Sequence, residues 1–215
     1  MHMKIREPGS AITHLIATIL AALAAIPLLI KASSIHGTAI LAMTIFIVSM
    51  ILLYAASTTY HSVNVTGDRL KKFKKVDHMM IFVLIAGSYT PVCMMILEHS
   101  TGYKLLALVW AVALIGMTIK FFWVTCPKWF SSIIYIAMGW LCIPVVKPLF
   151  SILPRAAFLW LLAGGIMYTV GGVIYALKLP IFNSLHKYFG SHEIFHVFVM
   201  FGSFCHFIFM YFYVL

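Results

Sequence analysis

Three histidines from two distant stretches of the chain have the types and spacing of ligands for one metal ion. His192 and His196 are four residues apart, so on a helix both imidazoles lie on one face, with Cβ atoms about 5 to 6 Å apart. His61 can supply a third imidazole. Three neutral imidazoles with one open position are typical of a catalytic zinc, which lowers the pKa of a bound water to about 7. The pattern therefore predicts Zn²⁺ as a cofactor and hydrolysis as the chemistry.

Two further polar residues accompany these histidines and are our candidate catalytic residues. Ser57 lies one helical turn before His61 on the same face, where it could orient a ligand or contact substrate. Asp77 could hold a metal-bound water or ligate the metal directly. In either role its negative charge partly offsets the charge of the cation in a low-dielectric setting.

The same residues leave two other functions open. The segment from His192 to His196 also matches H-E-x-x-H, in which Glu193 would be the general base of an intramembrane metalloprotease. If Asp77 instead completes the coordination, the zinc is structural. The protein would then be a non-enzymatic membrane regulator, a receptor, or a channel or cytolysin.

The composition requires that membrane helices hold these residues. Of 215 residues, 63% are apolar and 9% are charged, whereas soluble domains are about half apolar and a quarter charged. These values exclude a water-soluble globule, and the 15% aromatic content excludes disorder. Four single cysteines without a CxxC pair suggest neither a disulfide framework nor a thiolate zinc site.

Seven apolar runs reach the length of about 20 residues that a helix needs to cross a bilayer core. The predicted spans are 13–34, 38–60, 77–97, 103–123, 131–150, 156–179 and 192–215. We therefore expect an all-α, polytopic seven-transmembrane-helix bundle. Residues 1–215 would form a single integral membrane domain in a multi-pass protein of the cell membrane.

Basic residues are distributed unequally between the two sides of this bundle. Short segments rich in Lys and Arg remain cytoplasmic, and one side carries Lys4, Arg6, Arg69, Lys71, Lys72, Lys74, Lys75, Lys120, Lys128, Lys178 and Lys187, against Lys31, Lys104, Lys147 and Arg155 on the other. The N-terminus is thus predicted inside and the C-terminus outside. The formal net charge of +10 favours anionic lipid of the inner leaflet, rather than nucleic acid, as a partner.

With this orientation, the polar residues of all three spans lie at one depth. The second span runs inward and ends near Ser57 and His61, while the third and seventh spans begin on the inner side. Ionisable groups inside a bilayer are costly and usually functional. We therefore expect Asp77 and the three histidines to form one site near the inner leaflet, where membrane lipid is the available substrate.

Three other histidines have weaker predicted roles. We expect His14 to anchor the first span at the interface, with a position beside the metal ligands as the alternative. We expect His78 to be a packing residue, because it is turned about 100° from Asp77 around the helix. His206 shares a helical face with His192 but lies about 21 Å further along the axis. His206 could line a cavity but could not share the metal.

Several motifs together resemble the hemolysin III family. They are Ser57-Thr-Thr-Tyr-His61, Asp77-His78, Ile85-Ala-Gly-Ser-Tyr-Thr-Pro91, Met138-Gly-Trp140 and His192-Glu-Ile-Phe-His196, and they extend over nearly the whole chain. This family is the bacterial branch of the progestin and adipoQ receptor superfamily, which is also similar to the alkaline ceramidases.

The resemblance implies a seven-helix bundle with a cytosolic N-terminus. Zinc would be held by the three histidines, Asp77 would reach it through water, and Ser57 would be the family's serine. Members of the superfamily are linked to hydrolysis of lipid amides such as ceramide, to membrane-lipid homeostasis and, for the bacterial branch, to cytolysis. The leading hypothesis is accordingly a zinc-dependent hydrolase of lipid amides or esters at the inner leaflet.

Overall fold

The computed structural model describes residues 5–177 and 189–215, and this part of the chain is helical without strands. Seven segments of it are long and apolar enough to cross a membrane. They are α1 (Pro8–Ser33), α2 (Gly37–Ser62), α3 (Gly67–Met95), α4 (His99–Phe122), Lys128–Ile152, α7 (Arg155–Leu177) and Ser191–Val214. The predicted all-α, seven-span, multi-pass architecture is confirmed. Lys4, Lys178, Lys187 and the end of the sixth predicted span lie outside the described residues.

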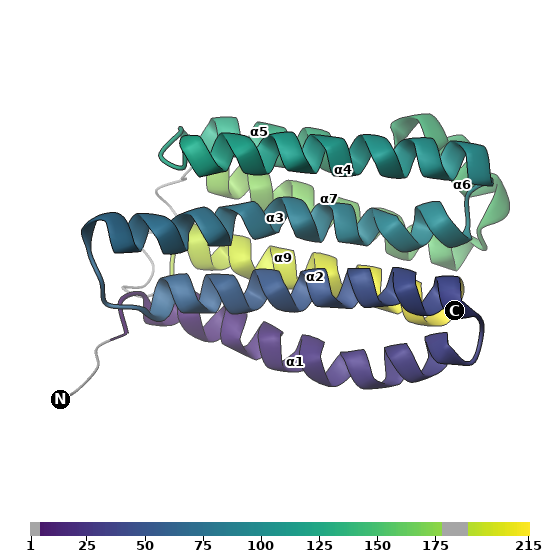
Figure 1. The fold of residues 1–215 in the computed structure, drawn as a ribbon, viewed down its shortest axis with the longest axis horizontal. Coiled ribbons are helices and arrows are strands. Elements are labelled where there is room, and N and C mark those ends of the chain that lie inside the picture. Colours follow the sequence, from purple (N-terminus) through teal and green to yellow (C-terminus); the bar gives the residue numbers. More distant parts are fainter. Residues whose placement is uncertain (1–4, 178–188) are drawn as a thin grey trace.

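The arrangement of the helices brings the first and last ones together (Figure 1). The second helix packs between α1 and α3, while α4 packs on α3. On the other side, α9 (Ser191–Phe209) packs between α1 and α7. The starts of α1, α3 and α9 and the end of α2 therefore meet at one end of the bundle, on the left in Figure 1. We call this the site end, because every residue of the predicted site lies on these elements.

The third helix begins before the predicted span. It starts at Gly67, whose φ of +63° suits glycine, ten residues ahead of Asp77. The basic residues Arg69 to Lys75 therefore lie on its first turns and not in a loop. Lys and Arg are good helix formers, so the apolar run marks where the bilayer begins and not where the helix begins.

The fifth predicted span is broken in the middle. Its first part, α5 (Lys128–Gly139), is followed by a 3₁₀ turn at Ile143–Val145 that contains Pro144, and then by α6 (Val146–Ile152). Tyr89 of α3 donates a hydrogen bond to the Gly139 carbonyl at 2.6 Å and accepts one from the Cys142 amide at 3.0 Å. A side chain of a neighbouring helix thus satisfies backbone groups that the break leaves free within the membrane.

Close packing fixes α2 against α3. A Cβ on Gly87 of α3 would overlap the side chain of Ser49 of α2, so the absence of a side chain lets these helices approach closely. Phe46 of α2 is fully buried, and Phe82 of α3 is fully buried against Gly116 of α4. The α2 and α3 residues of the site are consequently held in a fixed relation to each other.

Candidate metal centre

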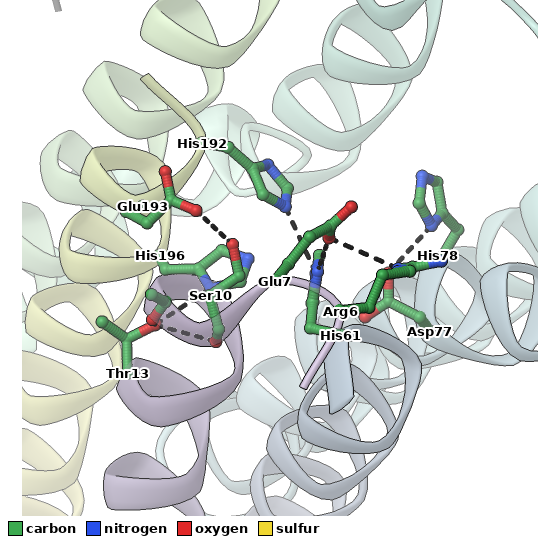
Figure 2. A network of polar contacts seen from close by, with 11 residues as sticks. Arg6, Glu7, Ser10, Thr13, His61, Asp77, His78, His192, Glu193 and His196 are labelled. Carbon is green, nitrogen blue, oxygen red and sulfur yellow. Dashed lines mark hydrogen bonds and ion pairs between the residues drawn. The ribbon is translucent and has the colours of Figure 1, made fainter. Parts of the chain in front are cut away.

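Three imidazoles from α2 and α9 converge at the site end (Figure 2). His61 lies in the last turn of α2, and His192 and His196 lie in the first two turns of α9. One ring nitrogen from each lies within 4.8 Å of the other two. His61 and His196 are 1% and 2% exposed. The structure thus brings together the three residues that we predicted as metal ligands.

The spacing within this histidine trio fits a metal ion. The Nε2 atoms of His61 and His192 are 3.2 Å apart. Two imidazole nitrogens that bind one zinc at 2.0 to 2.1 Å with tetrahedral angles are separated by about 3.3 to 3.4 Å. An all-imidazole donor set suits zinc and several other first-row metals. The residues present can therefore hold such an ion with little movement of these two rings.

Asp77 and Ser57 stand beside the trio. Both are buried, and both line the same cavity as His192 and His196. The Asp77 carboxylate is not part of the group of mutually close ligand atoms. The position of Asp77 therefore suits contact with a metal through a water molecule better than direct ligation.

His78 has a different role from the one that the sequence predicts. It was expected to be a packing residue turned away from Asp77, but its Nδ1 lies 2.9 Å from the Asp77 Oδ2. The 100° between adjacent helical residues separates their Cβ atoms, and a ring that folds back along the helix surface closes that gap. His78 therefore belongs to the immediate surroundings of the Asp77 carboxylate.

Of the two roles predicted for His14, the structure favours a position beside the metal ligands. Instead of anchoring the span at the interface, it is 3% exposed and stacks on His196, with ring centroids 3.6 Å apart and an interplanar angle of 8°. The cause is the early start of α1 at Pro8, which puts His14 almost two turns into a helix that packs on α9. His14 therefore covers one face of a trio ring.

Glu193 does not have the position of a protease base. Its Oε2 accepts a hydrogen bond from the Gly190 amide at 2.9 Å, and its Oε1 accepts one from the Ser10 hydroxyl. Both oxygens are thus used at the start of α9, where an acidic residue stabilises the exposed amides. The H-E-x-x-H alternative requires a carboxylate that is free to act on water, and this geometry disfavours it.

Residues just before and inside the first turns of α1 contact the trio, although no motif in the sequence predicts this role for them. The Glu7 carboxylate pairs with His61 Nδ1, and the Thr13 hydroxyl lies 3.2 Å from His196 Nδ1. The hydrogen bond with His61 holds the pKa of Glu7 below its usual range, against the opposing effect of partial burial. The only available signal was that Glu7 is one of five acidic residues in the chain.

A cavity of about 250 Å³ begins beside the trio and continues into the bundle. Its wall includes Asp77 and Val92 of α3, which are about 22 Å apart along the helix, and His192 and His206 of α9, about 21 Å apart. Between these ends the lining is mostly aliphatic and aromatic, with Leu, Ile, Val, Phe, Tyr and Trp side chains. His206 lines the far part of the cavity, too distant to share a metal with the trio.

Comparison with known proteins gives consistent matches over almost the full length. A family model described as "Haemolysin-III related" matches residues 2–207. The chain is 43% identical over 213 residues to "Hemolysin-3" of Bacillus cereus, covering 97% of this chain and 92% of that protein. It is 42% identical over 200 residues to "Hemolysin-3 homolog" of Bacillus subtilis (strain 168), covering 92% and 89%.

Proposed function

Because the chain belongs to the haemolysin-III-related family, we propose that it is a zinc-dependent membrane hydrolase of lipid amides or esters that serves membrane-lipid homeostasis. The ligands would be His61, His192 and His196, and the catalytic residues would be Asp77 and Ser57. The observation that carries this proposal is the position of the trio, which lies at one end of a deep, mostly apolar cavity.

The cavity favours a substrate with a long acyl chain. It extends for about 21 Å along α9, which is a large part of the roughly 30 Å hydrocarbon thickness of a bilayer. Apolar walls gain free energy by burying an alkyl chain. A lipid whose chain fills the cavity would hold its polar linkage beside the trio, so an amide or ester at the head of the chain is the bond presented for cleavage.

The side chains at the site end suit hydrolysis of such a bond. A bound zinc ion would supply Lewis acidity and lower the pKa of a coordinated water to about 7. The Asp77 carboxylate would accept a proton from the attacking water and return it to the leaving amine or alcohol. The Ser57 hydroxyl would donate a hydrogen bond to the carbonyl oxygen, where negative charge develops. The apolar lining would exclude bulk water from this exchange.

The position of the site relative to the membrane supports a substrate in the inner leaflet. Arg69, Lys71 and Lys72 are exposed on the first turns of α3, at the same end of the bundle as the trio (Figure 1). The predicted orientation makes this end cytoplasmic. Each basic residue near a membrane surface contributes about 1 kcal/mol of attraction to anionic lipid, so we also propose anionic headgroups as neighbours of the site.

The proposal is tested with purified protein in lipid nanodiscs. Metal content is measured, and turnover of long-chain amide and ester lipids is followed by mass spectrometry. We expect one zinc per chain and cleavage that His192→Ala abolishes. Glu193→Gln separates this mechanism from a protease, because it should spare lipid cleavage. A wild-type protein that retains zinc but cleaves nothing in a broad lipid panel would contradict the hydrolase and favour a structural zinc.

A lytic activity is the second candidate, because both relatives carry the name hemolysin. A channel or cytolysin would release a dye trapped in liposomes. If the protein causes leakage that His192→Ala does not change, and no lipid is cleaved, the lytic function is favoured over the hydrolase.

A further inference from the structure

We propose that the start of α1 positions the metal ligands, with Glu7 and Thr13 each holding one imidazole so that its Nε2 faces the ion. This inference rests on the proposed metal site. It makes Glu7 and Thr13 positioning residues, which act through His61 and His196 without contacting substrate or metal.

Thr13 fixes the protonation of His196. Its hydroxyl has a single proton, which it donates within α1 to the Gly9 or Ser10 carbonyl, at 3.0 and 2.9 Å. Towards His196 Nδ1, 3.2 Å away, the same oxygen can therefore only accept. With the hydroxyl proton used in this way, His196 carries its own proton on Nδ1, which leaves the Nε2 lone pair free for a metal.

Glu7 fixes His61 in the same way and adds a charge. An ionised carboxylate can only accept hydrogen bonds, so its contact requires a proton on His61 Nδ1. The His61 Nε2 lone pair is then directed at His192 Nε2, 3.2 Å away. A carboxylate behind a ligating imidazole fixes the orientation of the ring and raises its basicity.

His192 provides the contrast within the trio. Its Nδ1 is buried and has no hydrogen-bond partner among residues 5–177 and 189–215. No contact within the described residues sets the tautomer of His192, so without metal it can donate Nε2–H to His61 and lose that proton when an ion binds. The two ligands backed by α1 are therefore preorganised, and His192 is the one that adjusts.

The backbone at the start of α1 is also held by contacts that do not depend on the Glu7 carboxylate. The Glu7 backbone amide donates to the His61 carbonyl at 3.0 Å. In the first turn of α1, the Ser10 hydroxyl donates a hydrogen bond to Glu193. The Arg6 guanidinium lies 4.3 Å from the centre of the Tyr60 ring, but it also pairs with the Glu7 Oε2 at 3.3 Å and is therefore not independent of that carboxylate. The hydrogen bonds of the Glu7 amide and the Ser10 hydroxyl should keep the backbone in place when the Glu7 side chain is changed, so substitutions there can be interpreted.

The test measures metal binding without any reference to catalysis. Zinc affinity is determined by competition with a chromophoric chelator for the wild type, Glu7→Gln and Thr13→Val. We expect Glu7→Gln to weaken binding by about 10- to 100-fold, the range for outer-shell partners of metal ligands. Thr13→Val should weaken it by about fivefold, as expected for one neutral hydrogen bond.

Matched controls are available in α4. Glu98 is an N-cap carboxylate distant from the trio, so Glu98→Gln repeats the loss of charge. Thr118 is exposed and donates to the Leu114 carbonyl at 2.8 Å, so Thr118→Val repeats the loss of a helical threonine. Neither change should alter zinc affinity by more than twofold.

Cobalt substitution gives a readout that a loss of folding would not mimic. The visible spectrum of the Co²⁺ form reports ligand geometry, and we expect it to shift in Glu7→Gln and to return towards wild type in Glu7→Asp, while the metal-free variants still unfold in one cooperative transition, slightly below the wild type. Wild-type affinity and spectrum in Glu7→Gln would overturn the positioning role. If the wild type itself binds no metal, the proposed function fails instead.

Discussion

Glu7 is the N-cap of α1 and Glu98 is the N-cap of α4, and these two N-caps lie at opposite ends of the bundle. Their carboxylates make different contacts. Glu98 caps its own helix by accepting hydrogen bonds from the amides of Ser100 and Thr101 at 2.9 and 3.0 Å. Glu7 makes no such bond in α1, and its carboxylate pairs with His61. A side chain that usually stabilises its helix is used at the site end to hold a ligand ring.

The buried histidines differ between the two ends in a similar way. His206, far from the trio, directs its Nε2 to the Leu161 carbonyl at 3.3 Å and packs where Gly164 leaves space. Nearby, the hydroxyls of Tyr54 and Tyr168 both bond the Ser203 hydroxyl. The hydroxyls there bond one another and His206 Nε2 has a backbone partner, although its Nδ1 has none among residues 5–177 and 189–215. At the site end, in contrast, the Nε2 atoms of His61 and His192 face each other. Burial of a histidine does not indicate a ligand, but convergence of ring nitrogens does.

The largest expected effect is the loss of zinc and turnover when His61 is removed from the site end. Removal of His206 from the other end of the bundle provides the comparison. His61→Ala should abolish stoichiometric zinc binding and lower turnover by at least about 10³-fold, because the contribution of a catalytic metal is several kcal/mol. His206→Ala should leave zinc content unchanged, although it opens a void near Gly164. Metal analysis and lipid turnover of the two variants provide the measurement. Equal loss of zinc in both would remove the distinction between the two ends.

Asp77→Asn tests the group next to the trio and should have the second-largest effect. The amide keeps the shape of the side chain but cannot accept the proton of water, so we expect turnover to fall by about 10² to 10⁴-fold. Zinc affinity should change much less, because the carboxylate does not belong to the group of close ligand atoms. A loss of zinc equal to that of His61→Ala would instead identify Asp77 as a direct ligand.

The sequence predicts part of the site end and leaves another part unpredicted. Helical spacing is enough to pair His192 with His196 and Ser57 with His61, since each pair lies within one helix. A common depth in the bilayer joins them to Asp77. The contacts of Glu7 and Thr13 join the first helix to the second and last, and no periodicity in the sequence encodes which side chain faces which across such an interface.

Lys120 shows the same limit for charge counting. It was counted with the basic residues that set topology, but it is 1% exposed, and its Nζ hydrogen-bonds Ser131 and lies 3.0 Å from Cys126 Sγ. The connection after α4 folds back over the end of that helix, which covers the ammonium group. A count of basic residues predicts a side of the membrane and cannot predict whether a given side chain is solvated.

Ser203→Ala should change stability and leave the metal site intact. The substitution leaves the hydroxyls of Tyr54 and Tyr168 without their shared partner, and an unsatisfied buried polar group costs about 1 to 3 kcal/mol. Thermal unfolding in nanodiscs should therefore occur at a lower temperature, with unchanged zinc affinity. A lower zinc affinity at an equal melting temperature would mean that this hydroxyl cluster is coupled to the trio, to which Tyr54 is linked by its contact with the His14 ring at 5.0 Å.

The smallest expected effect concerns the cap at Glu98, and its sign follows from the pKa. Hydrogen bonds from the Ser100 and Thr101 amides hold the pKa of Glu98 below its usual range, because they favour the charged form. A carboxyl with a lowered pKa in the folded state contributes stability above its unfolded pKa and loses it as the pH falls through the folded value. The wild type should therefore melt at a slightly higher temperature than Glu98→Gln at pH 7, and the difference should disappear in acid below the ordinary range of glutamate. A difference in melting temperature that persists in acid would mean that the shape of the side chain, and not its charge, accounts for the cap. Zinc affinity at pH 7 completes the comparison, because Glu7→Gln should lower it and Glu98→Gln should not.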